Sequence, residues 1–310
     1  MDHETDFWTP GRFAQITQGQ WLRPAEDAAR SLNGVTIDSR TVQPGQVFVA
    51  IKGENHDGHD HVSQAIERGA GLVIVARDIA DRGLRNVDWS AKPQASQGPQ
   101  SAIRNPQSAI LLVPDTVLAL QQLAAAWRDE LARAGVKVIA VTGSNGKTTT
   151  RNLIHTALSA RLRGTQSPKS FNNHLGVPLT LLATPVDVDF VVAEVGTNHV
   201  GEIETLAKIV RPDAAVITTI GTAHIGHFGS REAIAKEKSA LLKYVGAPSP
   251  DLGSSKPSRG LAVVRGDEPY LESWRRDVIP AGTPVVTFGL NNTCDVHLKN
   301  AIRTDAAGVH

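Results

Sequence analysis

A short glycine-rich segment carries the strongest chemical signal in the sequence. It reads Thr142-Gly143-Ser144-Asn145-Gly146-Lys147-Thr148-Thr149-Thr150 and lies between an apolar run and a helical pattern. Glycines let backbone N–H groups turn toward an anion, a lysine reaches β- and γ-phosphate oxygens, and a threonine hydroxyl can ligate Mg²⁺. The two glycines are closer together than in the general P-loop, so the match is to a subtype. The predicted nucleotide-binding residues are Gly143, Ser144, Asn145, Gly146, Lys147, Thr148 and Thr149.

Two more polar residues follow later apolar runs. Glu194 closes the run 190–193, and His224 follows the run 214–220. Carboxyl ends of parallel strands meet at one edge of a sheet, where a hard oxygen ligand can share a metal ion with nucleotide phosphates. Each residue alone is as well explained by a solvated charge or a capping residue, but together they favour one crevice. Lys236 and Lys238 lie on the helical pattern that follows, where a solvated basic face is the simpler interpretation.

An alternating α/β sheet is needed to position these residues. Nearly continuous apolar runs occupy 136–141, 190–193, 214–220, 261–264 and 285–288, and helical patterns occupy 148–162, 201–210 and 230–245. This alternation predicts a mostly parallel sheet with helices on both faces and a ligand site outside the carboxyl ends of the strands. We expect this P-loop ATPase domain to occupy residues 115–310, beginning with a helix after Pro114 that stops at Gly135.

A smaller α/β domain is expected at residues 1–114. Its short β-rich runs lie at 35–37, 47–51 and 72–76, with a helical stretch at 61–68. Two stretches rich in Pro and Ser, at about 90–108 and at 248–258, are expected to be solvated loops. The first contains a near repeat of Pro-Gln-Ser-Ala-Ile and is interpreted as a low-complexity insertion near the domain boundary.

The composition narrows the possible partners and compartment. The 310 residues include 32 Lys plus Arg and 31 Asp plus Glu, so a net charge of +1 argues against nucleic acid as a partner. Charged residues interrupt every apolar stretch, which argues against membrane insertion. With one cysteine, Cys294, and a start that lacks a signal-peptide pattern, we expect a cytoplasmic protein, and we expect it to be a monomer.

The motifs and their order resemble the Mur ligases, the ATP-dependent amino-acid and peptide ligases of peptidoglycan synthesis. The resemblance rests on the short phosphate loop, Ser170-Phe-Asn172-Asn173-His-Leu-Gly176, Glu194-Val-Gly196-Thr-Asn198-His199, Ala223-His224 and Lys236-Glu-Lys238. In the first 114 residues, Asp38-Ser39-Arg40 and Asp57-Gly58-His59 are similar to the family's uridine-diphosphate domain.

The resemblance implies ATP and two Mg²⁺ ions as cofactors. The implied catalytic residues are Lys147, Asn172, Asn173, His224 and Lys238, with the two asparagines beside the γ-phosphate and acyl group. The implied metal ligands are Thr148, Glu194, His224 and Lys238, the last after carbamylation of its amine. The implied UDP-sugar contacts are Ser39, Arg40, Asp57, Gly58 and His59. Ala240 departs from the pattern, because family members commonly have Glu at this position.

The implied activity is a cytoplasmic step in cell wall biogenesis, on which cell shape and division depend. The motif contexts most resemble members that add D-Ala-D-Ala to a UDP-N-acetylmuramoyl tripeptide through an acyl phosphate. The alternatives are members that add the third residue, a folylpolyglutamate synthase, and a non-catalytic module that binds nucleotide and UDP-sugar. The family's third, C-terminal domain is expected to be absent from this chain, which motivates the last alternative.

Overall fold

The computed structural model describes residues 6–78, 108–169, 171–223, 225–248 and 259–297, together with 299, 304–305 and 308–309. It divides into two compact units, Met1–Trp127 and Arg128–His310. The division falls inside the long helix α3 (Thr116–Arg133), and the boundary expected after residue 114 stays a prediction. The two expected loops lie outside the described residues except for Ser108 and Pro248.

The first unit is built on a sheet that has five strands within the described residues. They are β1 (Gln20–Arg23), β2 (Val35–Thr36), β3 (Val47–Val49), β4 (Leu72–Val75) and β5 (Ala109–Leu112), in the order β1-β5-β4-β3-β2. β1 is antiparallel to β5, and the other pairs are parallel. The unit also contains α1 (Pro10–Thr17), the 3₁₀ turn η1 (Gly58–His61) and α2 (Val62–Glu67). The predicted small α/β unit is therefore confirmed.

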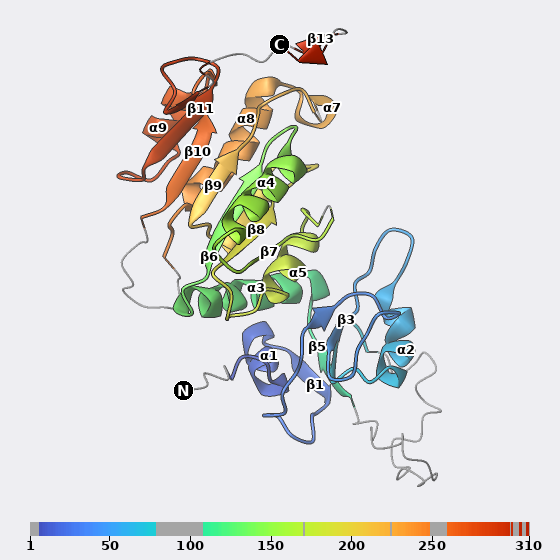
Figure 1. Ribbon diagram of the computed structural model, residues 1–310. Coiled ribbons are helices and arrows are strands. Elements are labelled where there is room, and N and C mark those ends of the chain that lie inside the picture. The colour runs from blue at the N-terminus through green and yellow to red at the C-terminus, as the bar shows by residue number, and fades with distance from the viewer. Residues whose placement is uncertain are drawn as a thin grey trace. The chain divides into compact units, whose positions relative to one another are not determined.

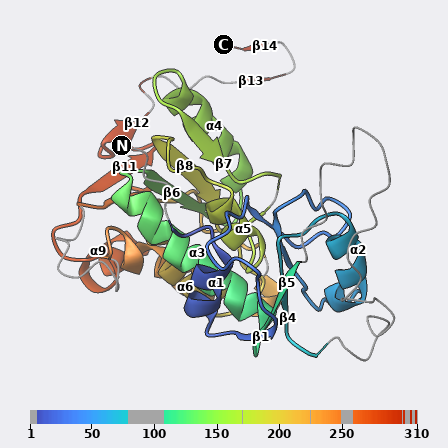
Figure 2. The same cartoon turned by 90° about the horizontal axis from the view of Figure 1, so that it is seen from below.

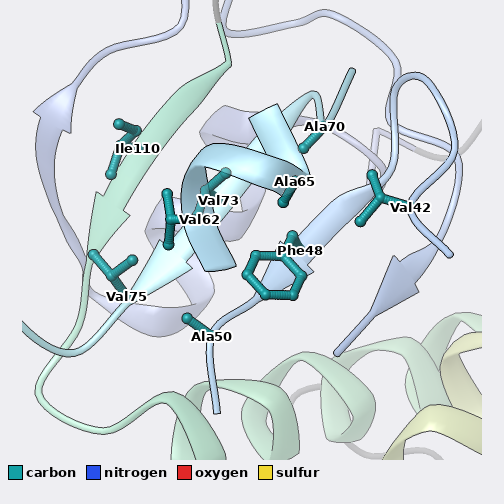
Figure 3. Packing of buried hydrophobic residues seen from close by; sticks show 9 residues of the cluster. All are labelled: Val42, Phe48, Ala50, Val62, Ala65, Ala70, Val73, Val75 and Ile110. Carbon is teal, nitrogen blue, oxygen red and sulfur yellow. The ribbon is translucent and has the colours of Figure 1, made fainter. Parts of the chain in front are cut away.

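Apolar side chains fill the space between α2 and this sheet. Figure 3 shows Phe48 of β3 close to Val62 and Ala65 of α2, with Val73 and Val75 of β4 in the same cluster. Phe48 is 1% exposed, and Ala65 and Val73 are completely buried. Because β4 is buried on both faces, it consists entirely of apolar residues, and this made it recognisable in the sequence.

The second unit contains a parallel sheet that has seven strands within the described residues. They are β6 (Lys137–Thr142), β7 (Gly164–Gln166), β8 (Phe190–Glu194), β9 (Ala214–Ile217), β10 (Leu261–Arg265), β11 (Val285–Gly289) and β12 (Val296–His297). Their order across the sheet is β12-β11-β10-β9-β6-β8-β7, as Figure 1 shows for most of its strands. Every neighbouring pair is parallel, so the strand that precedes the phosphate loop lies between β8 and β9.

Helices cover both faces of this sheet. They are α4 (Lys147–Ser159), α5 (Gly176–Leu182), α6 (Glu202–Val210), α7 (Ile225–Phe228), α8 (Arg231–Ser239), the 3₁₀ helix η3 (Ala240–Tyr244) and α9 (Leu271–Asp277). Figure 2 shows α4 and α6 on opposite sides of the strands. α4 packs through Ile154 and Leu158 against a cluster that includes Val141 and Val192. This arrangement confirms the predicted fold class.

Two features complete the description of the chain. A short antiparallel pair, β13 (Thr304–Asp305) and β14 (Gly308–Val309), lies outside both sheets. Within the described ranges, no helix combines the length and the hydropathy that crossing a membrane requires.

Phe48→Ala is expected to destabilise the first unit by about 3–5 kcal/mol, because it removes a buried ring and leaves a cavity. Leu22→Ala is the control: Leu22 is 38% exposed, and its loss should cost less than about 1 kcal/mol. Urea unfolding followed by tryptophan fluorescence measures both changes. Equal losses for the two variants would contradict the packing described for β3 and α2.

Candidate active site

A tight loop joins β6 to α4 at the carboxyl edge of the second sheet. Gly143 and Gly146 have φ values of +150° and +81°, which side chains disfavour. Gly143 also lacks space for a side chain, because an added Cβ would lie 1.9 Å from Thr218 Oγ1. Gly146 is the N-cap of α4, and no side chain among the described residues caps that end. The N–H groups of the first turn therefore face a potential anion site.

Residues that follow β9 hold the loop from one side. The Ser144 N–H donates to the Thr219 carbonyl at 2.8 Å, and the Gly221 N–H donates to Ser144 Oγ at 2.9 Å. The Thr218 hydroxyl donates to the Asn145 carbonyl at 2.5 Å. The predicted nucleotide-binding residues Ser144 and Asn145 are thus fixed in place by a neighbouring strand end without any ligand.

Lys147 is the first residue of α4 and folds back over the loop. Its Nζ donates to the Gly143 carbonyl at 2.9 Å. Burial lowers the pKa of Lys147, and the negative charge of Glu194 acts in the opposite direction. The ammonium group therefore lies at the glycine-rich loop and interacts electrostatically with the carboxylate that ends β8. Thr149, two residues along the helix, is exposed.

Glu194 ends β8 and is 1% exposed. Its Oε2 accepts a hydrogen bond from the Thr148 hydroxyl at 2.8 Å, and its Oε1 accepts one from Asn172 Nδ2 at 2.8 Å. Thr148 comes from α4, and Asn172 comes from the segment before α5. The structure therefore brings together Lys147, Thr148, Asn172 and Glu194, all of which were predicted site residues.

Two small residues make this convergence possible. Gly196 leaves room for Asn172, because an added Cβ at Gly196 would lie 2.9 Å from Asn172 Cγ. The Gly196 N–H also donates to the Asn172 carbonyl at 2.7 Å. Ser167, which follows β7, accepts a hydrogen bond from the Glu194 N–H at 3.0 Å. The sequence analysis did not select Ser167, since nothing in the local pattern shows which backbone group it binds.

Arg151 is a second cation beside Glu194 that the sequence analysis missed. Its Nη1 lies 3.4 Å from Glu194 Oε2, and 5% of its side chain is exposed. The sequence feature that could have identified Arg151 is its helical spacing. It lies three residues after Thr148 and four after Lys147, on the same face of α4.

Lys238 lies on α8 and is 2% exposed, whereas Lys236 on the same helix is exposed. Burial lowers the pKa of Lys238 to about 8, with a smaller contribution in the same direction from the charge of Lys147. Glu237 opposes this shift. The Glu237 carboxylate accepts from the N–H groups of Gly201 at 2.7 Å and Ile203 at 2.8 Å, so it joins α8 to the start of α6.

Asn173 follows Asn172 in the sequence but has different hydrogen-bond partners. Asn173 Oδ1 accepts from the N–H groups of Leu175 and Gly176, at 3.2 and 2.9 Å, and so supports the start of α5. His224 lies outside the described residues, and its role stays a prediction. Across the part of the chain that the structure describes, no group of three or more His, Cys, Asp or Glu side chains gathers as a metal site. The donors beside the loop are instead a hydroxyl and one carboxylate.

In the first unit, the predicted UDP-sugar contacts Ser39 and Arg40 lie on one turn. The Ser39 hydroxyl donates to Gln64 Oε1 at 2.7 Å, and Ser39 is 6% exposed. Arg40 is exposed and donates through Nε and Nη2 to the two carboxylate oxygens of Asp38, at 2.9 and 2.8 Å. Hydrogen bonds from Arg40 hold the pKa of Asp38 at about 2. Arg40 therefore presents an oriented guanidinium group to solvent.

The predicted residues Asp57, Gly58 and His59 form a closed local network. His59 Nε2 accepts from the Ala76 N–H at 2.9 Å, so its Nδ1 carries the proton and donates to Asp57 Oδ1 at 2.6 Å. The His59 side chain is 4% exposed. An added Cβ at Gly58 would lie 2.7 Å from the Ile51 nitrogen, so the turn requires glycine. These contacts give His59 a structural role, and its predicted contact with substrate stays a prediction.

The cluster in the second unit combines the parts that phosphate chemistry requires. Unpaired N–H groups at a helix start, a lysine and hard oxygen donors can hold a polyphosphate together with a divalent cation. Residues 141–310 match the Mur ligase middle domain, and residues 31–128 match the Mur ligase family catalytic domain.

Individual relatives agree with these family matches. The UDP-N-acetylmuramoyl-tripeptide–D-alanyl-D-alanine ligase of Bacillus subtilis is 37% identical over 207 residues, which are 67% of this chain and 40% of the relative. A crystal structure of MurF from Acinetobacter baumannii gives a TM-score of 0.73 at 32% identity, covering 96% of this chain and 55% of that one. MurF ligase from Thermotoga maritima, in complex with ADP, gives 0.62 at 28% identity, covering 84% and 51%.

The share of each chain that the matches cover determines what they establish about this protein. The chain spans about 40% of the length of the Bacillus subtilis relative, so the comparison bears on that part of the longer protein. The middle-domain match alone extends over more than half of the sequence and includes the phosphate loop, Glu194 and Lys238. On this basis, the chain belongs to the Mur ligase family.

Proposed function

We propose that the chain provides the UDP-substrate and ATP sites of a ligase that adds D-alanyl-D-alanine to a UDP-N-acetylmuramoyl tripeptide. The observation that carries the proposal is the convergence of Lys147, Thr148 and Asn172 on Glu194 beside the phosphate loop. The name of the Bacillus subtilis relative supports this choice of substrates, and the ADP complex of the Thermotoga maritima structure supports the use of ATP. Because the proposed reaction uses ATP and a UDP-linked precursor, we assign it to the cytoplasm, as a step of peptidoglycan synthesis.

The proposed reaction has two steps. The terminal carboxylate of the tripeptide attacks the γ-phosphorus of ATP, ADP leaves, and an acyl phosphate forms. The amine of the dipeptide then attacks the acyl carbon, inorganic phosphate leaves, and an amide bond forms with release of a proton. Because an anion must approach a triphosphate, the main requirement is to compensate negative charge at the transferring group. No side-chain nucleophile is needed.

Lys147 and the start of α4 meet this requirement. Lys147 would exchange its hydrogen bond to the Gly143 carbonyl for one to a phosphate oxygen. The N–H groups that follow Gly146 would bind neighbouring phosphate oxygens, and the helix dipole favours negative charge there. The half-buried position of Lys147 strengthens its attraction to phosphate relative to a fully solvated lysine.

The donor set beside the loop fits a magnesium ion. The Thr148 hydroxyl and the Glu194 carboxylate are hard oxygen donors, their oxygens are 2.8 Å apart, and Mg²⁺ binds such groups together with substrate phosphates. When bound, the ion would neutralise phosphate charge and polarise the transferring group. We assign Thr148 and Glu194 to one ion, and His224 with carbamylated Lys238 to a second. Asn172 holds the Glu194 carboxylate in the orientation that presents it to the ion.

Carbamylation of Lys238 needs a neutral amine, since only the free base adds CO₂. With a pKa of about 8, roughly a tenth of Lys238 amines are neutral at pH 7. An ordinary lysine with a pKa near 10.4 has less than about one neutral amine in a thousand at that pH. Burial of Lys238 at 2% exposure would also protect the product from water.

The UDP-sugar end of the substrate is assigned to the first unit. Arg40 would bind an anionic or carbonyl oxygen through its exposed guanidinium group, while Ser39 holds the same turn against α2 through Gln64. Asp57, Gly58 and His59 would shape the neighbouring turn. The name of the Bacillus subtilis relative supports this assignment of the UDP-linked substrate.

Lys147→Ala is expected to weaken MgATP binding by at least about tenfold and to abolish acyl phosphate formation, since the phosphates lose a charged partner. Calorimetry measures the binding, and phosphate release in the presence of the UDP-tripeptide measures the transfer. Lys208→Ala removes a lysine whose side chain is 60% exposed on α6 and should change neither. Near-normal acyl phosphate formation by Lys147→Ala would refute the assigned role.

Carbamylation of Lys238 is expected to increase with pH and to level off above about pH 8. The folded-state pKa is lowered, so the reactive neutral amine accumulates as the pH rises through that value. ¹³C NMR after incubation with ¹³C-bicarbonate measures the carbamate at fixed total carbonate. Lys236→Arg should keep the signal and Lys238→Arg should lose it; a signal that survives in Lys238→Arg places the modification elsewhere.

The acceptor decides between the alternatives within the family. We expect phosphate release from radiolabelled ATP, with the UDP-tripeptide present, to increase on addition of D-Ala-D-Ala and not of single amino acids. Turnover with a single diamino acid alone, using the UDP-dipeptide, would instead identify a ligase for the third residue. Binding of the UDP-tripeptide without any phosphate release would favour the non-catalytic binding module.

A further inference from the structure

Arg151 is a buried cation to which the proposed reaction assigns no task. It lies on α4, one turn after Lys147, and 5% of its side chain is exposed. A guanidinium group removed from water destabilises the fold unless it is hydrogen bonded and its charge is compensated. The groups that bind the Arg151 guanidinium therefore show which parts of the structure depend on its charge and its hydrogen bonds.

The guanidinium group contacts three different parts of the chain. Its Nη1 donates to the Lys169 carbonyl oxygen and lies 3.4 Å from Glu194 Oε2. Its Nε and Nη2 donate to Asn152 Oδ1, at 3.3 and 2.9 Å. Among the partners that the structure describes, Glu194 is the one that carries a negative charge. Asn152 is exposed and binds the guanidinium group at the protein surface.

The contact with Lys169 reaches the chain segment that delivers Asn172 to the same carboxylate. Lys169 has a φ of +47°, in the left-handed region that a lysine adopts only when its surroundings hold it there. Three residues later, Asn172 donates to Glu194 Oε1. Arg151 thus acts on Oε2 directly and on the backbone of Lys169, while Asn172 binds Oε1, so both oxygens of the carboxylate have a partner.

We propose that Arg151 is a positioning residue, which fixes the Glu194 carboxylate so that its Oε2 stays beside the Thr148 hydroxyl for a divalent cation. This inference deepens the proposed function and rests on it, because there Glu194 and Thr148 share a magnesium ion. If Arg151 served only as a counter-charge for Glu194, it would weaken the binding of a divalent cation instead of supporting it. A positive charge at 3.4 Å from the carboxylate repels a divalent cation, so removing a mere counter-charge would strengthen metal binding.

The two roles are distinguished by Mn²⁺ binding to the chain in the presence of ADP, measured from the electron paramagnetic resonance signal of free Mn²⁺. Arg151→Met is expected to weaken Mn²⁺ binding by about 10- to 100-fold, the usual consequence of losing a group that orients a metal ligand. Asn152→Ala removes the acceptor that holds Nε and Nη2 and leaves the buried charge in place. It should weaken binding by a smaller factor, about threefold, and it keeps the test valid if Arg151→Met fails to fold.

Arg161→Met is the matched control, because it removes the same charge from an exposed residue just after α4. It should leave Mn²⁺ binding within about twofold of the parent chain, which excludes an effect of net charge. Unchanged or tighter Mn²⁺ binding in folded Arg151→Met and Asn152→Ala overturns the positioning role and leaves the proposed function intact. A parent chain that binds no Mn²⁺ with ADP contradicts the proposed metal site, and the inference falls with it.

Discussion

The buried carboxylate of Glu194 is the constraint on which the rest of the site depends. At 1% exposure, an ionised carboxylate is stable only if nearby donors and cations replace the water it has lost. Two elements that are separate in the sequence supply them: α4 through Thr148 and Arg151, and the segment before α5 through Asn172. The end of β7 adds a contact to the backbone, because Ser167 accepts a hydrogen bond from the Glu194 N–H. The loops around Glu194 are thereby tied to one another before any ligand arrives.

The register of the sheet explains why these loops meet. β6 lies between β8 and β9, and Val141 of β6 is paired with Glu194 of β8, while Thr142 is paired with Ile217 of β9. The three strands therefore end at the same level, and their loops leave the sheet side by side. Thr218 and Thr219 can then fix the phosphate loop from β9 while Glu194 approaches it from β8. A shift of register by one residue would separate the carboxylate from the hydroxyl of Thr148.

Local patterns made the central strands, the phosphate loop and Glu194 predictable, because strands buried on both faces consist of apolar residues and the loop has a fixed spacing. The edge strands β7 and β12 were missed, since they are short and less buried. Arg151 was missed because its partners lie 18 and 43 residues away, a relation that helical spacing alone does not show. The burial of His59 and the two hydrogen bonds of its ring nitrogens are likewise properties of the folded unit that its motif does not show, and its contact with substrate stays a prediction.

The charges near the phosphate loop bear on the proposed modification of Lys238. Lys147 and Arg151 act on Glu194, and a protonated Lys238 adds a positive charge that acts on Lys147 and is opposed by Glu237. These positive charges favour binding of an anionic triphosphate and disfavour binding of divalent cations. Carbamylation of Lys238 would replace this positive charge by a negative one, because it converts an ammonium group into an anion. Under the proposed function, the lysine that would repel metal ions when protonated would attract them when carbamylated, so we expect CO₂ uptake to precede binding of the proposed second ion.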